Sequence, residues 1–342
     1  MELLFLIIAL GIILLSSEFF TNGVEVLGEG LCLSQAVVGS VLAAVGTALP
    51  ETIIPLVAIF LYKGKAGSSI GVGAILGAPF MLTTMGLFLV GTGIYIRSLF
   101  KKLSPSIHIE KNNLVRDLRF FLISYSVAIF FPFFFPNTRL FHYLIAVFLF
   151  FNYLLYLFFT FKAESSEVCA LKELYLVKPL KKFNICPGKT IIVILAILQV
   201  ITSVFTMIKG AHLFVHNLEI LARKLGMDPL LFALLIAPIA TELPEKFNSF
   251  LWTLREKDVL ALGNITGAIV FQSTFPVSVG LLFTNWKIHG LALVSALIAI
   301  FLTFFYFLII KLLKRLPPAV LLISGFFYVF YVLLVLHRFN KI

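Results

Sequence analysis

Apolar residues run along this chain in windows of about 20 residues, the length that an α-helix needs to cross the hydrocarbon core of a bilayer. Short polar segments separate the windows. The pattern predicts an all-α membrane protein with ten spanning helices, at residues 2–20, 34–61, 68–96, 118–135, 140–161, 190–221, 228–253, 257–283, 289–313 and 317–337.

The polar stretch 162–189 separates five predicted helices from five. We therefore predict a first five-helix repeat at 1–161, a cytoplasmic linker at 162–189, and a second five-helix repeat at 190–342.

The two halves share a short phrase inside a predicted span. Residues 43–51 read AAVGTALPE, and residues 237–245 read APIATELPE. Aligning Ser17–Glu51 with Ala211–Glu245 gives nine identities in 35 positions, five of them in this phrase. The similarity continues in the next span of each half, in the segments Gly73–Ala78 and Gly263–Ala268. Because five helices is an odd number, the second half enters the membrane in the opposite direction, which predicts an inverted repeat.

Composition excludes a soluble protein, because 61% of the residues are hydrophobic, 13% are charged, and the mean hydropathy is +1.07. The net charge of +11 does not indicate nucleic-acid binding, since the basic residues flank predicted spans. Of the 27 Lys and Arg residues, 17 lie on the side away from the N-terminus. The positive-inside rule thus predicts a multi-pass protein of the cell (inner) membrane with its N-terminus outside.

Several chemistries have no signature in the chain. Cys32, Cys169 and Cys186 form no CxxC pair, which argues against a disulfide framework or a structural zinc site. The absence of a P-loop disfavours ATP-driven pumping. No Ser/His/Asp order or zinc-protease motif is present, so we expect neither an enzyme nor a cofactor.

Glu51 and Glu245 are the strongest candidates for chemistry. A carboxylate in hydrocarbon costs at least about 2.5 kcal/mol, so a buried one usually holds a cation or a proton. The inverted repeat would bring both carboxylates to one ion, and calcium favours such oxygen ligands. Pro50 and Pro244 should break each helix and free backbone carbonyls as further ligands. The alternative is a pair of protonated, hydrogen-bonded structural glutamates.

Three kinds of polar residue surround these glutamates. Glu242 lies one helical turn before Glu245 and is either a third ligand or proton acceptor, or a carboxylate in a water-filled vestibule. Thr47 and Thr241 could coordinate sodium, bond back to the helix, or do both. Lys246 either offsets a carboxylate or extends along the helix to the interface, and the pattern favours the second reading.

Other residues have simpler interpretations. His212 and His216 have the i, i+4 spacing of a metal pair, but no acidic context accompanies them, so we expect no metal site there. Glu25 and Glu219 match in the two repeats and are predicted to cap or hydrate helix ends. Glycines at matched positions let helices approach closely: Gly46, Gly73, Gly77, Gly263 and Gly267.

At these residues the chain resembles the sodium/calcium exchangers of the calcium/cation antiporter superfamily, whose repeats read roughly G-T-S-x-P-E and then G-N-x-x-G-S-N/D. Here Gly46–Glu51 reads GTALPE and Gly73–Pro79 reads GAILGAP. In the second half Ala240–Glu245 reads ATELPE and Gly263–Ile269 reads GNITGAI.

The resemblance implies ten helices, Glu51 and Glu245 as calcium ligands, and Thr47 and Thr241 as ligands of flanking sodium sites. It also implies inorganic cations and the lipid bilayer as partners, with Ca²⁺ exchanged for Na⁺ or H⁺. It leaves the oligomeric state open.

The chain departs from the family pattern at its neutral ligands. Pro79 and Ile269 stand where the family has polar residues on the third and eighth helices, and Ala48 and Glu242 replace serines. Carboxylates are retained while neutral oxygens are lost, which fits proton coupling, another cation, or a copy without activity. Nearby residues that could substitute are Thr83, Thr84, Gln272, Ser273 and Thr274.

The sequence therefore predicts a secondary cation antiporter, with calcium as the favoured cation and sodium or protons as the coupling ion. The first spans of each half, near 2–20 and 190–221, would slide or rock to alternate access. Two other hypotheses remain: a cation channel or leak, and a membrane scaffold without transport.

Overall fold

The computed structural model describes residues 1–30, 43–62, 65–134, 138–163, 174–177 and 188–339, and the three cysteines lie outside these ranges. Every regular element in them is a helix, as the sequence predicts. The elements are α1 (Glu2–Gly30), α2 (Ala43–Leu56), η2 (Val57–Leu61), α3 (Lys65–Met81), η3 (Leu82–Gly86), α4 (Leu87–Lys101), α5 (Lys111–Phe134), α6 (Arg139–Ala163), α8 (Lys189–Lys224), α9 (Pro229–Leu254), α10 (Asp258–Gln272), α11 (Phe275–Phe283), α12 (Gly290–Leu313) and α13 (Pro318–Phe339).

Seven of the described helical segments are long and apolar enough to cross a membrane, and two shorter apolar helices cover Pro50–Leu61 and Pro229–Ile239. The longest candidate, Ala66–Lys101, combines α3, η3 and α4. α5 matches the remaining predicted span, but its first turns carry charges at Lys111, Arg116, Asp117 and Arg119. These helices make the protein an integral, multi-pass membrane protein.

The helices form two compact units. The first contains Met1–Tyr62 and Phe158–Leu221, and the second contains Lys63–Leu157 and Ala222–Ile342. Each unit contains helices from both predicted repeats, so the two units do not coincide with the two repeats. The division into repeats at residues 1–161 and 190–342 stays a prediction.

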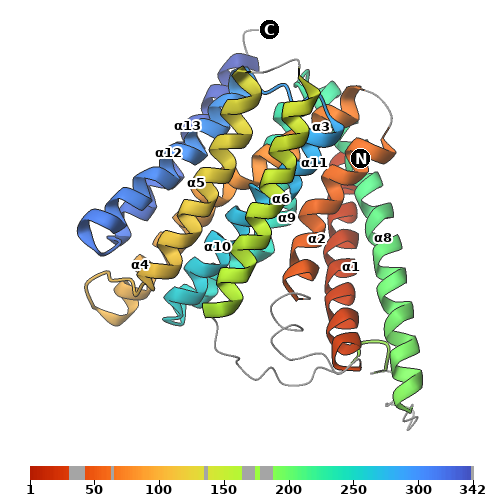
Figure 1. Cartoon of the computed structure of the whole chain (residues 1–342), viewed down its shortest axis with the longest axis horizontal. Coiled ribbons are helices and arrows are strands. Elements are labelled where there is room, and N and C mark those ends of the chain that lie inside the picture. Colours follow the sequence, from red (N-terminus) through yellow and green to blue (C-terminus); the bar gives the residue numbers. More distant parts are fainter. Residues whose placement is uncertain (31–42, 63–64, 135–137, 164–173, 178–187, 340–342) are drawn as a thin grey trace. The chain divides into compact units, whose positions relative to one another are not determined.

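In the first unit α1 and α8 pack antiparallel (Figure 1). The hydroxyls of Ser16 and Thr206 are hydrogen-bonded at 2.8 Å, and Val26 and Ala196 share a buried apolar cluster. Gly210 on α8 faces α1, where a Cβ would come within 2.9 Å of Ile12. The two helices thus approach closely through a small residue, as membrane helices often do.

In the second unit α3 packs along α9. At two points the backbones of these helices approach closely, with no side chain between them. A Cβ on Gly73 would collide with the carbonyl oxygen of Leu230, and one on Gly77 would collide with that of Leu234. α9 begins with Asp228, whose carboxylate accepts hydrogen bonds from the amides of Leu230 and Leu231 at 2.9 and 3.2 Å. Pro229 follows as the first helical residue, a position where its missing N–H costs nothing.

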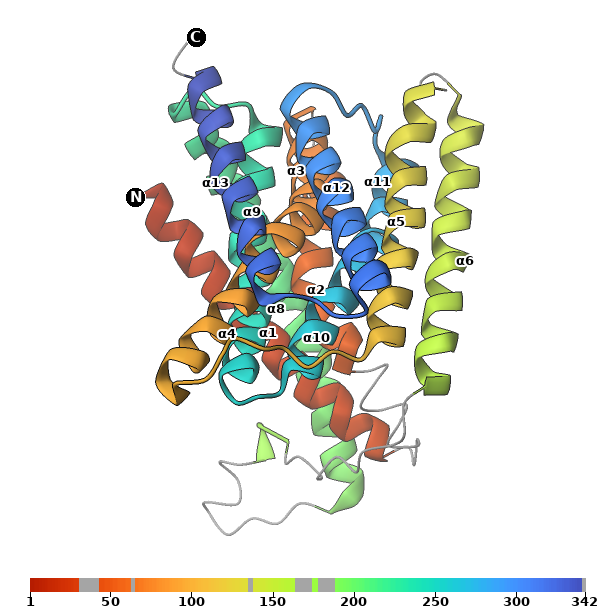
Figure 2. The same cartoon turned by 90° about the vertical axis from the view of Figure 1, so that its left-hand side faces the viewer.

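The other helices of this unit cover the α3–α9 pair. α12 contacts both α3 and α5, and α13 contacts α4. α5 and α6 run antiparallel and side by side in both views (Figures 1 and 2), and the amide of Asn152 donates a hydrogen bond to the hydroxyl of Ser124 at 2.6 Å. Between α4 and α10, Arg97 forms an ion pair with Asp258 at 2.6 Å and donates to the Thr253 carbonyl at 2.8 Å.

The expected breaks at Pro50 and Pro244 do not occur, because α2 and α9 both continue through these prolines. Proline cannot donate a hydrogen bond to the carbonyl four residues earlier, so the carbonyls of Gly46 and Ala240 still lack their usual helical donor. The helical assignment is thus continuous across both prolines, and the role of these carbonyls as ligands stays a prediction.

Candidate functional site

Both repeats depart from regular α-helix at the same place, ten and eleven residues after Gly73 and Gly263. In the first half this place is the π-helix η3, which contains Thr83 and Thr84. In the second half it is the junction between α10 and α11, at Ser273 and Thr274. π-Helical turns frequently mark functional sites in membrane and soluble helices alike.

The four hydroxyls at these turns are buried and have their protons in use. Thr83 donates to the carbonyl of Pro79 at 2.7 Å, and Thr84 donates to that of Phe80 at 2.6 Å. Ser273 and Thr274 both donate to the carbonyl of Val270, at 2.9 and 2.8 Å. A hydroxyl that donates its proton in this way keeps lone pairs with which it can ligate a cation. η3 also packs against α9 and α10.

Glu242 on α9 is fully buried, with 0% of its surface exposed. The amide of Gln272, the last residue of α10, donates a hydrogen bond to its Oε1 at 3.3 Å. Thr241 is also buried, and its hydroxyl donates to the carbonyl of Ala237 at 3.2 Å, which confirms the prediction that it bonds back to its helix. The alternative that places Glu242 in an open, water-filled vestibule is wrong.

Lys246 does not extend to the membrane interface, which corrects the reading that the sequence pattern favoured. Its side chain is 1% exposed, and it lies one helical turn after Glu242 on the same face of α9. A lysine that reached the interface would leave its ammonium accessible to water. The side chain instead stays buried, and the alternative role of Lys246 as a counter-charge to a carboxylate stays a prediction.

The remaining predicted ligands are distributed between the two units. Glu51 lies on α2 in the first unit and is buried, and Thr47 lies one turn earlier on the same helix. Glu245 lies on α9 in the second unit, together with Thr241 and Glu242. The side chains of Thr47 and Glu245 lie outside the described part of the chain, so their roles as ligands, and the meeting of Glu51 with Glu245 at one ion, stay predictions.

A buried acid that the sequence pattern did not indicate lies beside the repeated glycine motif. Asp117 on α5 is buried and accepts a hydrogen bond from the hydroxyl of Thr266 on α10 at 2.7 Å. Arg116 lies 3.1 Å from the same carboxylate, with its guanidinium over the ring of Tyr156. The available signal was an acid at the edge of a predicted span, where charges are usually solvated.

The histidine pair has an aromatic neighbour. Tyr62 packs against the rings of His212 and His216, and its hydroxyl lies 3.2 Å from Nδ1 of His216. No group of three or more His, Cys, Asp or Glu side chains that could hold a metal ion occurs in the described residues.

A family profile and two relatives match this sequence. The family profile described as sodium/calcium exchanger protein matches residues 1–162 and 195–337. An uncharacterized membrane protein of Methanocaldococcus jannaschii is 25% identical over 299 residues, which cover 85% of this chain and 87% of that protein. CaxA of Alkalimonas amylolytica, an antiporter by name, is 35% identical over 86 residues, which are 25% of this chain and 27% of CaxA.

Two kinds of solved structure share the fold. The H⁺/Ca²⁺ exchanger CAX matches with a TM-score of 0.64 at 18% identity, over 99% of this chain and 88% of that one. The sodium–calcium exchanger NCX_Mj matches with a TM-score of 0.56 at 20% identity, over 97% of this chain and 99% of that one. Since the family profile covers most of the sequence, the protein is a member of the sodium/calcium exchanger family of membrane transporters.

Proposed function

We propose that the protein is a secondary antiporter that moves Ca²⁺ across the membrane in exchange for protons. The observation that carries this proposal is Glu242, a fully buried carboxylate held by Gln272 on a membrane helix of a cation-exchanger family. Membership of a transporter family also supports a role other than catalysis.

The charges near the repeated phrase bear on how many monovalent coupling ions exchange for one Ca²⁺. Glu51, Glu242 and Glu245 carry three negative charges when ionised, and Lys246 carries one positive charge. The remaining two negative charges are balanced by one Ca²⁺, by two protons or by two sodium ions, so the charge count gives the number of coupling ions and leaves their identity to the other ligands. A buried site of this kind avoids the cost of an uncompensated charge in both loaded states.

The neutral ligands favour protons over sodium as the coupling ion. Sodium sites rely on neutral oxygens, and Pro79 and Ile269 provide no side-chain oxygen. The hydroxyls of Thr83, Thr84, Ser273 and Thr274 are buried within a few residues of these positions and can contribute lone pairs to a calcium ion. Carboxylates crowded together hold protons near neutral pH, because like charges disfavour full ionisation.

Alternating access would use the first unit. It contains α1 and α8, the first spans of the two halves, packed against each other, and it also contains Glu51 on α2. We propose that this unit moves as the transport step, with the N-terminus outside and the protein in the cell membrane, as the distribution of Lys and Arg predicts.

The test is calcium uptake into proteoliposomes that contain the purified protein. Vesicles with an acidic interior should take up Ca²⁺ as protons leave, and sodium-loaded vesicles diluted into sodium-free buffer at equal pH should take up much less. Larger uptake by the sodium-loaded vesicles than by the vesicles with an acidic interior would assign sodium as the coupling ion. Uptake that is independent of both gradients would support the channel hypothesis, and absence of uptake would support the scaffold.

Glu242→Gln should remove proton-driven uptake, because glutamine keeps the size of the side chain and cannot bind and release a proton. Glu256→Gln is the matched control: Glu256 lies in the loop after α9, pairs with Lys101 at 2.6 Å, and is exposed. The control variant should transport like the wild type. Proton-driven uptake that persists at the wild-type rate in Glu242→Gln would show that this carboxylate does not carry the coupling proton.

A further inference from the structure

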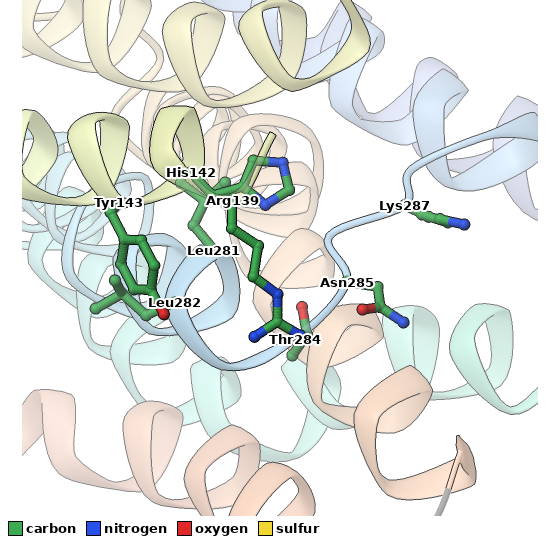
Figure 3. A pocket seen from close by; sticks show the side chains of 8 residues that line it. All are labelled: Arg139, His142, Tyr143, Leu281, Leu282, Thr284, Asn285 and Lys287. Atoms are coloured by element: carbon green, nitrogen blue, oxygen red, sulfur yellow. The ribbon is translucent and has the colours of Figure 1, made fainter. Parts of the chain in front are cut away.

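A pocket of about 220 Å³ lies in the second unit, and none of the repeated glutamates is among the residues that line it (Figure 3). It opens between the first turn of α6 and the loop that follows α11. Three of its side chains come from α6, two from α11 and three from the loop: Arg139, His142, Tyr143, Leu281, Leu282, Thr284, Asn285 and Lys287.

The lining is positively charged and includes an unsatisfied polar group. Arg139 and Lys287 contribute two cations, and none of the eight residues is acidic. His142 is 7% exposed, and its Nε2 has no hydrogen-bond partner among the described residues. Buried polar atoms in proteins are nearly always satisfied, so an imidazole nitrogen of this kind at a pocket points to a bound group. The positive end of α6 lies at the same place.

The loop wall of the pocket is held in a fixed position. Trp286 is buried, and its indole N–H donates to the carbonyl of Ala128 on α5 at 3.0 Å. Its ring lies against Gly280, where a Cβ would collide with it. The hydroxyl of Thr284 accepts a hydrogen bond from the Trp286 amide at 3.1 Å and donates to the Gly280 carbonyl at 2.6 Å. Asn285 and Lys287 therefore flank the pocket from an anchored loop.

The pocket lies at the ends of two candidate membrane spans. Arg139 is the first residue of the candidate span Arg139–Thr160, and Thr284 directly follows the candidate span Asp258–Phe283. Phosphate groups of lipids occupy this level of a bilayer, and basic pockets between helices recognise them. We propose that this pocket is an anion site that binds a phosphate group, with an acidic phospholipid headgroup or free phosphate as its source.

The test uses the purified full-length protein in detergent. Short-chain phosphatidylglycerol, short-chain phosphatidylcholine and inorganic phosphate are titrated separately, and binding is followed by the unfolding temperature and by bound mass in native mass spectrometry. The double variant Arg139→Gln/Lys287→Gln removes both cations from exposed positions. The control, Lys311→Gln/Arg315→Gln, removes two exposed cations at the far end of α12, about 35 Å along the helix from its start.

We expect phosphatidylglycerol to bind the wild type and the control, and the Arg139/Lys287 variant to bind about tenfold more weakly. Saturation by inorganic phosphate that displaces the lipid would identify the free anion as the source, whereas binding of the lipid alone would identify the headgroup. Equal binding by the variant and the wild type, or no binding of either phosphate compound, would overturn the proposal.

A second inference rests on a short piece of the central linker, Leu174–Val177, in the first unit. The backbone amide of Tyr175 donates to the side-chain oxygen of Asn22 at 2.9 Å, and the amide of Leu176 donates to that of Gln199 at 3.2 Å. The hydroxyl of Tyr175 donates to Glu18 at 2.6 Å. The segment Leu174–Val177 is thus hydrogen-bonded to both α1 and α8.

Apolar contacts reinforce these bonds. Leu174 and Val177 are buried in one cluster with Val26 and Ala196, and the ring of Tyr175 packs edge-on against Phe19 at 5.3 Å. The hydrogen bond to Glu18 raises the pKa of Tyr175 to about 12, so the phenol remains a donor at neutral pH. We infer that Leu174–Val177 is a latch that restrains the α1–α8 pair, an inference that rests on the proposed role of this pair in alternating access.

Two measurements test the latch separately from the proposed function. Hydrogen exchange should show protected amides at Tyr175 and Leu176 in the wild type, and rapid exchange there would overturn the contact. Tyr175→Phe should raise the rate of calcium exchange in proteoliposomes by about threefold or more, because it removes a charge-assisted hydrogen bond from the restraint. The control Tyr62→Phe removes a tyrosine hydroxyl elsewhere in the same unit and should leave the rate unchanged.

An unchanged or lower rate in Tyr175→Phe would overturn the restraint. If the wild type shows no exchange at all, the proposed function fails and the restraint fails with it, whereas protected amides would still establish the contact.

Discussion

Replacing Glu51 or Glu245 by glutamine should reduce calcium exchange by about 100-fold or more in each variant. Removing one charged partner from a buried ion pair costs about 3–5 kcal/mol, and each 1.4 kcal/mol is about a factor of ten. Glutamine keeps the size and one carbonyl oxygen of the side chain. The loss of calcium exchange would therefore report the removal of the negative charge and not a change in side-chain volume. Calcium uptake by proteoliposomes is the measurement, with protein incorporation determined for each variant.

The chain offers a matched control for Glu51. Glu219 lies on α8 in the same unit, and both glutamates are 6% exposed. Glu219→Gln therefore makes the same chemical change at the same burial outside the repeated phrase, and it should retain exchange. Equal losses in Glu51→Gln and Glu219→Gln would show that any buried acid of this unit is structural, and the cation-ligand assignment would fail.

Replacing Gly73 and Gly77 together by alanine should strongly destabilise the protein. Each new methyl group would collide with a backbone carbonyl of α9, and a backbone atom cannot move aside as a flexible side chain can. Overpacking of this kind costs about 1–3 kcal/mol at each site, more than the roughly 1 kcal/mol that alanine gains over glycine in a helix. The measurement is the fraction of detergent-solubilised protein that remains monodisperse after heating.

The matching glycine of the second repeat, Gly263, is expected to tolerate alanine. Gly263 matches Gly73 in sequence, but no described atom lies within 4 Å of a Cβ placed there. Gly263→Ala should therefore leave the stability unchanged or raise it slightly, because only the helix propensity changes. If Gly263→Ala and Gly73→Ala lowered the stability equally, the close contact of α3 with α9 would not be what the glycine serves.

The helices could be predicted from the sequence because membrane spans depend on a simple property, the length of an apolar run. Packing could not be predicted in the same way. Gly73 and Gly263 occupy equivalent positions in the repeat, yet a Cβ on Gly73 would collide with α9, whereas one on Gly263 would meet no atom of the described residues. The repeat therefore predicts the elements, while the neighbours of each element depend on contacts between segments far apart in the chain.

For the polar residues, too, some properties could be predicted from the sequence and others depended on tertiary structure. The importance of Glu242 followed from an acid inside an apolar run, and its burial agrees with that expectation. The burial of Lys246 did not follow, because a long side chain in a span can reach the interface or remain inside, and only tertiary structure decides. Asp117 was missed because it directly precedes the predicted span 118–135, where a solvated charge is the common case.

The most direct test of the exchanger assignment is whether calcium movement requires a counter-ion. Proteoliposomes loaded with radiolabelled Ca²⁺ would be diluted into alkaline calcium-free medium, into the same medium with unlabelled Ca²⁺, and into mildly acidic medium. Obligatory exchange predicts release of label with external Ca²⁺ or with external protons, and retention in the alkaline calcium-free medium. Equal release in all three media would indicate a leak, and retention in all three would contradict transport of calcium by this protein.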